Sequence, residues 1–379
     1  MTEIVQPSTV EAAAAALAAA AREGRSVRVR GGGTKLGWGA VVPAPDVELR
    51  TASLDRLVEH NVGDLTAVLE AGVPLGRAQA QFASAGQMLA LDPPLGAERA
   101  ATIGGVIATG DSGPLRHRYG GPRDLVIGIT VALSDGTVAR AGGNVIKNVA
   151  GYDLAKLFSG SFGTLGVIAR VNVRLHPRPP ALATALGSSA DPAVVAAAAR
   201  SLAAAPLELE ALDVAWRGGR GVLLARAAGA DPEPRAKRAA TLMRDHGLTG
   251  IDITPEDREL WARQRAGQRS AAKALVRVAA RPSQLERVLA AASECDATLV
   301  GRAALGTSYL ELDPHALARL SGRLPQTRAA VLLDAPEEVR RGEDPWGVSE
   351  GPALELMRRI KRRFDPVGIC NPGVFVGGI

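Results

Sequence analysis

The chain has 379 residues and a formal net charge of +6, and 46% of its residues are hydrophobic. This length exceeds one ordinary core, so we expect two domains. No uninterrupted apolar run reaches the roughly 18 residues of a transmembrane helix, and the two cysteines, Cys295 and Cys370, lie too far apart in sequence for a disulfide framework or a Cys-x-x-Cys metal motif.

The positive charge does not indicate nucleic-acid binding. Most of the arginines are scattered along the chain, and aromatic residues, which would stack on bases, make up only 3% of it. One dense basic cluster stands near the C-terminus and comprises Arg358, Arg359, Lys361, Arg362 and Arg363. It is either a solvated helix face or a contact for an acidic partner subunit.

The first elements are a helix and short strands. Residues 12–21 are rich in alanine, and Ser8 with Glu11 predicts a capping box before them, so we expect an amphipathic helix that stops at Gly24 rather than a signal sequence. We therefore expect a cytoplasmic protein, with association to a membrane through partner subunits as the alternative. Strands are predicted at 27–30 and 66–70, and a helix at 75–85 between Pro74 and Gly86.

Three glycine-rich segments follow one another in the first half. Residues 31–35 come directly after the first predicted strand, residues 102–110 contain the pair Gly104–Gly105, and residues 160–166 run into a strand over 167–175. The odd positions of that strand are apolar, and Arg170, Asn172 and Arg174 between them are polar, which predicts one buried face. Another strand, over 125–133, turns back at residues 134–137 as a hairpin.

Beyond the proline cluster at 176–180, which is a plausible domain boundary, the pattern changes. Helices are expected near residues 193–204, 235–246, 257–269, 283–293 and 352–364. Strands are expected near residues 221–228, 274–280, 306–312 and 329–334. This order predicts an α+β domain with a mostly antiparallel sheet covered on one face.

Standard nucleotide motifs do not account for the glycines. Leu36 stands where a dinucleotide fingerprint needs its last glycine, and residues 33–36 lack the Walker order of glycine, lysine and hydroxyl. Three separate segments of glycine and hydroxyl residues suit a longer ligand, with a diphosphate in the middle and a ring system at each end. FAD has this form.

Several motifs together resemble the vanillyl-alcohol-oxidase type, or PCMH-type, FAD-binding flavoproteins. They are Arg30 to Lys35, Asp92-Pro93-Pro94, Thr102 to Gly105, Lys147 to Leu154, Gly160 to Val167, and the tail from Asp365 to Gly373. More narrowly, residues 84–89, the double proline and residues 147–154 are similar to the FAD-binding E subunit of bacterial glycolate oxidase. The resemblance is strong over the first half and the last fifteen residues.

This resemblance implies an α+β fold in three parts. A PCMH-type FAD-binding domain of two α+β subdomains would span 1–178, and an α+β cap domain with a mostly antiparallel sheet would span 179–350. A C-terminal helix and tail over 351–379 would return to the FAD domain. The implied cofactor-binding residues are Arg30, Gly31, Gly32, Gly33, Thr34, Lys35, Pro94, Thr102, Gly104, Gly105, Thr109, Gly110, Gly160, Ser161, Gly163, Thr164, Gly166, Val167 and Ile168.

The resemblance also implies how the cofactor is held. Relatives with covalent flavin carry a histidine after the first glycine loop, whereas Thr34 to Gly37 follow it here, so FAD should be bound non-covalently. Relatives that oxidise D-2-hydroxy acids carry clustered histidines in the second domain. The five histidines of this chain are isolated, so no metal site is expected; they are His60, His117, His176, His246 and His315.

The expected function is that of an FAD-dependent oxidoreductase, or one subunit of it, of the glycolate oxidase type. It would oxidise a 2-hydroxy acid such as glycolate or D-lactate together with a catalytic flavoprotein subunit and an iron–sulfur subunit. Two alternatives stay open: a non-catalytic flavin-binding partner subunit, and a flavin oxidoreductase for an unrelated alcohol or sugar. The catalytic residues are unknown. A carboxylate-binding cation could be Arg116, Arg118, Lys147 or Arg281, and a proton relay could be Tyr152 or Tyr309.

Overall fold

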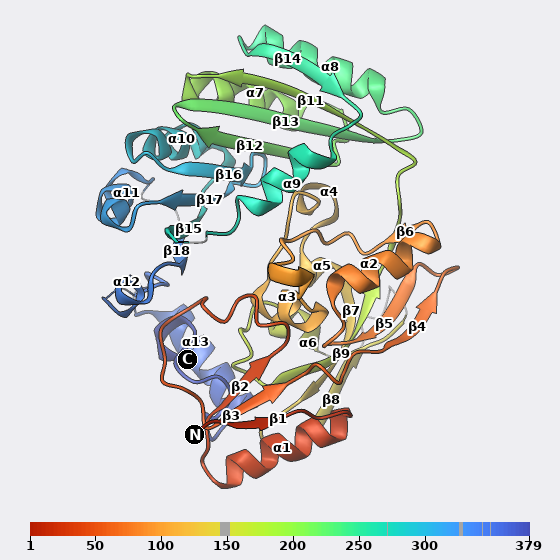
Figure 1. The fold of residues 1–379 in the computed structure, drawn as a ribbon, viewed down its shortest axis with the longest axis vertical. Coiled ribbons are helices and arrows are strands. Elements are labelled where there is room, and N and C mark those ends of the chain that lie inside the picture. The colour runs from red at the N-terminus through yellow and green to blue at the C-terminus, as the bar shows by residue number, and fades with distance from the viewer. Residues whose placement is uncertain (145–151, 271, 326–328, 343, 349) are drawn as a thin grey trace. The chain divides into compact units, whose positions relative to one another are not determined.

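The computed structural model describes residues 1–144, 152–270, 272–325, 329–342, 344–348 and 350–379. The chain forms two compact units (Figure 1). The first comprises residues 1–112, 119–178 and 348–379, and the second comprises residues 113–118 and 179–347. No helix in the described ranges has the length and hydropathy needed to span a bilayer.

The first unit contains two main sheets. A parallel three-stranded sheet has the order β1 (Glu3–Val5), β3 (Val47–Arg50), β2 (Val27–Arg30). An antiparallel five-stranded sheet has the order β4 (Leu57–Asn61), β5 (Thr66–Glu70), β9 (Val167–Arg174), β7 (Val126–Ala132), β8 (Val138–Gly142). A small pair joins β6 (Gln87–Met88) and β10 (His176–Pro177). The expected strands and the hairpin after β7 are confirmed.

Helices pack on both sheets of this unit. They are α1 (Val10–Arg22), α2 (Leu75–Ser84), α3 (Ile103–Thr109), α5 (Pro122–Leu125), α6 (Leu154–Phe158) and α13 (Pro352–Phe364), with short 3-10 turns at Ala97–Arg99 and Val376–Gly378. The short helix α4 (Arg116–Tyr119) belongs to the second unit except for its last residue. The predicted capping box at Ser8 is wrong: the N-cap of α1 is Thr9, whose hydroxyl accepts from the N–H of Ala12 at 3.0 Å.

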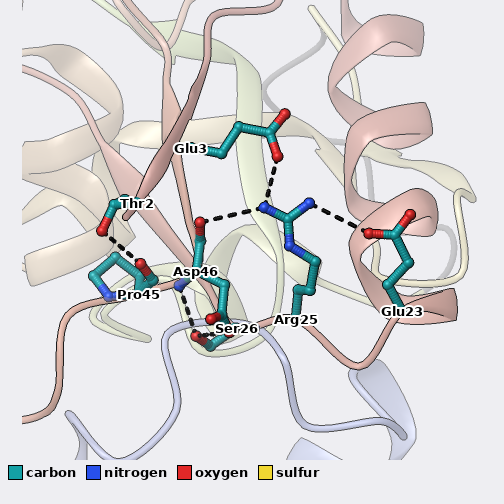
Figure 2. A network of polar contacts seen from close by, with 7 residues as sticks. All are labelled: Thr2, Glu3, Glu23, Arg25, Ser26, Pro45 and Asp46. Atoms are coloured by element: carbon teal, nitrogen blue, oxygen red, sulfur yellow. Dashed lines mark hydrogen bonds and ion pairs between the residues drawn. The ribbon is translucent and has the colours of Figure 1, made fainter.

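Polar contacts fix the edge of the three-stranded sheet (Figure 2). The guanidinium of Arg25 lies 2.6 Å from a carboxylate oxygen of Glu3, in β1, and 3.3 Å from one of Glu23, after α1. Asp46 accepts hydrogen bonds from the N–H and the hydroxyl of Ser26, both at 2.8 Å, and these bonds lower the pKa of its carboxyl. The loops before β2 and β3 are thereby joined.

The second unit is built on one antiparallel sheet of eight strands (Figure 1). Its order is β14 (Thr249–Thr254), β11 (Ala181–Ser189), β13 (Arg220–Gly229), β12 (Ala211–Arg217), β16 (Thr298–Arg302), β17 (Thr307–Leu312), β15 (Ala274–Ala279), β18 (Ala329–Asp334). The expected α+β class with a large antiparallel sheet is confirmed. Sequence reasoning missed β11, β12, β14 and β16.

Helices cover one face of this sheet. They are α7 (Pro192–Ala204), α8 (Glu233–Asp245), α10 (Leu285–Glu294) and α11 (Leu317–Arg323), and their apolar residues share a single core with alternate residues of the strands. Helix α9 (Arg258–Ala266) packs on the opposite face, where Trp261 contacts Ala211 and Leu224. The remaining elements are α12 (Glu337–Gly342) and 3-10 turns at Pro282–Gln284 and Pro314–Ala316.

Candidate functional site

The first glycine segment lies directly against the second. A Cβ added at Gly31 would overlap the hydroxyl oxygen of Thr102, and one added at Gly32 would overlap the carbonyl oxygen of Ala100. Only glycine therefore allows the loop after β2 to approach residues 100–102 so closely. This close packing accounts for two of the glycines without any ligand.

The second glycine segment forms the whole of α3, and Gly104 and Gly105 stand in its first turn. Thr102 is its N-cap, and the Thr102 hydroxyl accepts from the N–H of Gly105 at 3.3 Å. The N–H of Gly104 donates to the carbonyl of Ala71 at 2.8 Å. Both of these N–H groups are bonded within the protein, so a ligand would meet α3 through its surface and not through them.

The third glycine segment packs against the end of α3. The N–H of Gly160 donates to the carbonyl of Ile107 at 2.9 Å, and that of Phe162 donates to Ala108 at 2.8 Å. Gly160 has a φ of +81° and no atom within 4 Å of an added Cβ, so glycine here is required by backbone conformation and faces open space. The hydroxyl of Ser161 is buried and has no hydrogen-bond partner among the described residues.

The C-terminal tail joins this third segment to β2. The N–H of Asn371 donates to the carbonyl of Val27 at 2.7 Å, and its side-chain amide donates to the carbonyl of Phe162 at 2.6 Å. The rings of Phe162 and Phe375 stack with centroids 5.3 Å apart. The three glycine segments and the tail thus form one contiguous region.

A buried ion pair lies at the edge of this region. Lys35 Nζ is 3.3 Å from Asp111 Oδ2, and the two side chains are 5% and 0% exposed. Asp111 follows α3, and its N–H donates to the carbonyl of Val106 at 3.1 Å. Sequence reasoning selected Lys35 and missed Asp111, because nothing local marks an aspartate that pairs with a distant lysine.

The other expected cofactor residues occupy several kinds of position. The hydroxyl of Thr109 donates to the carbonyl of Gly105 at 2.8 Å, and Gly110 ends α3 in the left-handed conformation. The Thr164 hydroxyl donates to the carbonyl of Ser161 at 2.7 Å. Gly163 has a φ of +72°, and an added Cβ there would meet its nearest neighbours only at 3.9 Å.

The remaining expected cofactor-binding residues contact other groups of the first unit. Arg30 lies 3.4 Å from Glu48, and Gly33 has a left-handed φ of +72° beside the Arg30 guanidinium. Pro94 is buried. Thr34 packs against Gly96, so that a Cβ added at Gly96 would overlap the Thr34 methyl group. Gly166 directly precedes β9 and has a φ of +141°. Val167 and Ile168 pair with β7 in the five-stranded sheet, and their side chains are core residues.

The suggested carboxylate-binding and relay residues come from separate segments of the chain. Tyr152 is 92% exposed, Tyr309 is buried, and Arg118 donates to the carbonyl of Glu208 at 3.0 Å. Arg116 is on α4 and Arg281 precedes a 3-10 turn. Lys147 and most of the motif around it lie outside the described residues.

The histidines are dispersed over the two units. His60 and Gln87 share a hydrogen bond of 2.9 Å, the ring of His176 packs on that of Tyr119, and burial lowers the pKa of His117. His246 ends α8, and the N–H of His315 donates to Asp313. Within the ranges described above, no three His, Cys, Asp or Glu side chains gather in a group that could ligate a metal ion.

Comparison with known families decides what this region is. Residues 2–142 match the FAD binding domain, and residues 348–375 match the C-terminal domain of FAD linked oxidases. The chain is an FAD-linked oxidoreductase. Its cofactor is FAD, and the expected resemblance to PCMH-type flavoproteins is confirmed.

Three individual proteins are similar to this oxidoreductase in sequence. An uncharacterized FAD-linked oxidoreductase of Mycobacterium tuberculosis strain H37Rv is 27% identical over 98% of this chain and 90% of its own length. Glycolate oxidase subunit GlcE of Escherichia coli is 38% identical over 40% of this chain and 42% of its own. D-lactate dehydrogenase of Archaeoglobus fulgidus is 38% identical over 46% of this chain and 39% of its own. Over these stretches the chain is thus similar to a glycolate oxidase subunit and to a D-lactate dehydrogenase, and it spans about two fifths of the length of each.

The fold also has a solved counterpart. The structure of an alkyldihydroxyacetonephosphate synthase matches with a TM-score of 0.70 at 15% identity, over 97% of this chain and 76% of that one. At this identity the match concerns the fold alone.

Proposed function

We propose that this FAD-linked oxidoreductase oxidises a small 2-hydroxy acid such as glycolate or D-lactate, as one subunit of a glycolate-oxidase-type complex. The observation that carries the proposal is the convergence of the three glycine segments with the C-terminal tail, in the parts of the chain that match the FAD-linked oxidases. The similarity to glycolate oxidase subunits and to D-lactate dehydrogenase supplies the substrate class.

The residues around the converged segments fit an anionic dinucleotide. The Ser161 hydroxyl is a buried polar group without a partner among the described residues, and the open space at Gly160 lets a ligand reach the main chain. We propose that this third segment and the loop at Gly31 to Lys35 hold the diphosphate, while α3 supports the flavin side through its surface. Bound FAD would accept the two electrons that leave the α-carbon of the acid.

FAD is proposed to be held non-covalently, because Thr34 to Gly37 stand where a flavin-linked histidine would follow the first loop. The purified protein should be yellow, and acid precipitation should leave the flavin in the supernatant. Anaerobic addition of glycolate or D-lactate should then bleach the flavin absorbance. A protein that neither contains nor takes up FAD would overturn the cofactor assignment of these segments.

A second candidate is a flavin-binding partner subunit without catalysis of its own, since two of the similar proteins are named as glycolate oxidase subunits. The catalytic flavoprotein and iron–sulfur partners of the complex belong to this proposal. The same assay separates the candidates: bleaching by the isolated chain excludes the non-catalytic subunit. Bleaching only after a catalytic flavoprotein subunit is added excludes a self-sufficient enzyme.

A further inference from the structure

An aromatic pair lies where the third glycine segment meets the C-terminal tail. The rings of Phe162 and Phe375 have centroids 5.3 Å apart and planes inclined by 27°, which is a stacked arrangement. Both residues stay partly exposed, although their neighbours in the two segments, Ser161, Val374 and Val376, are buried. The stack is therefore a partly accessible apolar surface among buried neighbours.

The backbone at Phe162 is strained. Its φ of +56° lies in the left-handed region, which a bulky side chain rarely adopts. Two hydrogen bonds hold it there: its N–H donates to the carbonyl of Ala108 at 2.8 Å, and its carbonyl accepts from the Asn371 amide at 2.6 Å. Strain of this kind is concentrated at ligand sites. Glycine would adopt this φ without strain, so the phenyl ring contributes something that glycine cannot.

Phe162 joins α3 to the tail. Its N–H bonds to α3, whereas its carbonyl and its ring contact the tail. In the proposed cofactor arrangement, α3 supports the flavin and the third segment holds the diphosphate. The ring system on the tail side of the third segment is then the adenine. The inference rests on the proposed function for this placement alone.

We propose that Phe162, supported by Phe375, forms the contact surface for the adenine ring of FAD. Every nucleic-acid base has a π face, so adenine stacks on an aromatic side chain without needing directional hydrogen bonds. Phe162 would touch the base, and Phe375 would act through Phe162 as a positioning residue that holds its ring. The diphosphate would pass the open space beside Gly160, two residues earlier in the chain.

FAD and FMN separate this contact from a purely structural role, because FMN carries the flavin and a phosphate but no adenine. The apoprotein is titrated with each flavin, and the change in flavin fluorescence gives the dissociation constant. Phe162→Leu keeps an apolar side chain and the left-handed strain but removes the aromatic face. It should leave FMN binding unchanged and weaken FAD by roughly 5- to 150-fold, the range that base–aromatic stacking supplies.

A conservative variant and a matched control complete the test. Phe162→Tyr keeps the aromatic face and should retain wild-type affinity for FAD. The control is Phe158→Leu: the Phe158 ring lies 5.7 Å from that of Phe364 in a T-shaped pair, but Phe158 is 0% exposed. This variant should lower stability in urea unfolding and leave the affinity for both flavins unchanged. Wild-type affinity for FAD in Phe162→Leu, or an equal loss for FAD and FMN, would overturn the proposal.

Phe375→Leu tests the supporting role of the second ring. Alone it should weaken FAD less than Phe162→Leu does, again without an effect on FMN. In the Phe162→Leu background it should cause no further loss, because the ring that it positions is gone. Additive losses in the double variant would show that Phe375 does not act through Phe162.

Flavin reduction separates this inference from the proposed function. If Phe162→Leu weakens FAD selectively but glycolate and D-lactate do not bleach the flavin, the adenine contact stands and the proposed oxidation fails. If either acid bleaches the flavin while Phe162→Leu binds FAD as the wild type does, the oxidation stands and the adenine contact is wrong.

Discussion

Lys361 Nζ lies 2.7 Å from Asp365 Oδ2, one turn further along at the end of α13. The same ammonium donates to the carbonyl oxygens of Thr164 at 2.7 Å and Cys370 at 2.8 Å. Asp365 in turn accepts from the N–H of Cys370 at 2.7 Å. This single pair therefore ties the C-terminal helix to the third glycine segment and sets the start of the tail that carries Asn371.

Replacing Lys361 with methionine should be strongly destabilising. The change removes three donated hydrogen bonds and leaves the Asp365 carboxylate, which is 0% exposed, without its cation. Losing one partner of a buried pair costs about 3–5 kcal/mol, which urea unfolding followed by tryptophan fluorescence would measure.

The matched control for this change is Lys156→Met. Lys156 lies 2.7 Å from Asp153, but the two side chains are 51% and 49% exposed, so the loss should stay below about 1 kcal/mol. Equal losses in the two variants would mean that the Lys361 contacts do not stabilise the fold.

Asp365 should make stability depend on pH in the acid range. Burial alone would raise the pKa of its carboxyl, but the hydrogen bond and charge of Lys361 and the N–H of Cys370 hold it below the ordinary value of 3.8. A lowered folded-state pKa gives stability that is complete above the unfolded value and is lost as pH falls through the folded one. The stability advantage of the wild type over Asp365→Asn should therefore shrink below pH 3.8. Urea titrations between about pH 6 and 2.5 would measure it, and a constant difference would contradict the lowered pKa.

Two variants of Asn371 should separate the stability contributed by its side-chain hydrogen bond from the cost of its left-handed backbone conformation. Its φ is +44°, and its amide donates to the carbonyl of Phe162. Both Asn371→Gly and Asn371→Ala lose that hydrogen bond, which is worth about 1 kcal/mol, but alanine adds about 1–2 kcal/mol of left-handed strain. Urea unfolding should rank wild type above glycine and glycine above alanine. Titration of the apoprotein with FAD should show weaker binding in both variants, because the third glycine segment loses its contact with the tail.

Local patterns predicted the elements that have strong periodicity. The odd residues of β9, Val167, Ala169, Val171 and Val173, are all 0% exposed, as their alternation indicated. The missed strand β11 reads Ala-Leu-Ala-Thr-Ala-Leu-Gly-Ser-Ser, and alanine and glycine have low strand propensity. Its strand conformation comes from pairing with β13 and β14, which are distant in sequence.

The sequence predicted which segments form the candidate site, but it did not predict the contacts between them. Glycine and hydroxyl spacing located the three segments, but the bond from Asn371 to Phe162 spans 209 residues and the pair of Lys35 with Asp111 is also long-range. Gly104 and Gly105 were predicted to let the cofactor lie against the main chain. In the structure Gly104 approaches Ala71, a neighbour within the protein.

Gly104 and Gly105 should therefore respond differently to alanine. At Gly104 an added Cβ would lie 2.6 Å from the Ala71 Cβ, so Gly104→Ala overpacks the core and should cost about 1–3 kcal/mol. At Gly105 the nearest atom is the Thr102 hydroxyl at 3.2 Å, which needs to move only slightly and so keeps its N-cap bond, and alanine is the better helix former by about 1 kcal/mol. Gly105→Ala should thus retain stability in urea unfolding.

If α3 presents Gly105 to the flavin, Gly105→Ala should bind FAD more weakly in a fluorescence titration, because its methyl group occupies the surface that the cofactor needs. Unchanged FAD affinity in a fully stable Gly105→Ala protein would remove Gly105 from the cofactor site.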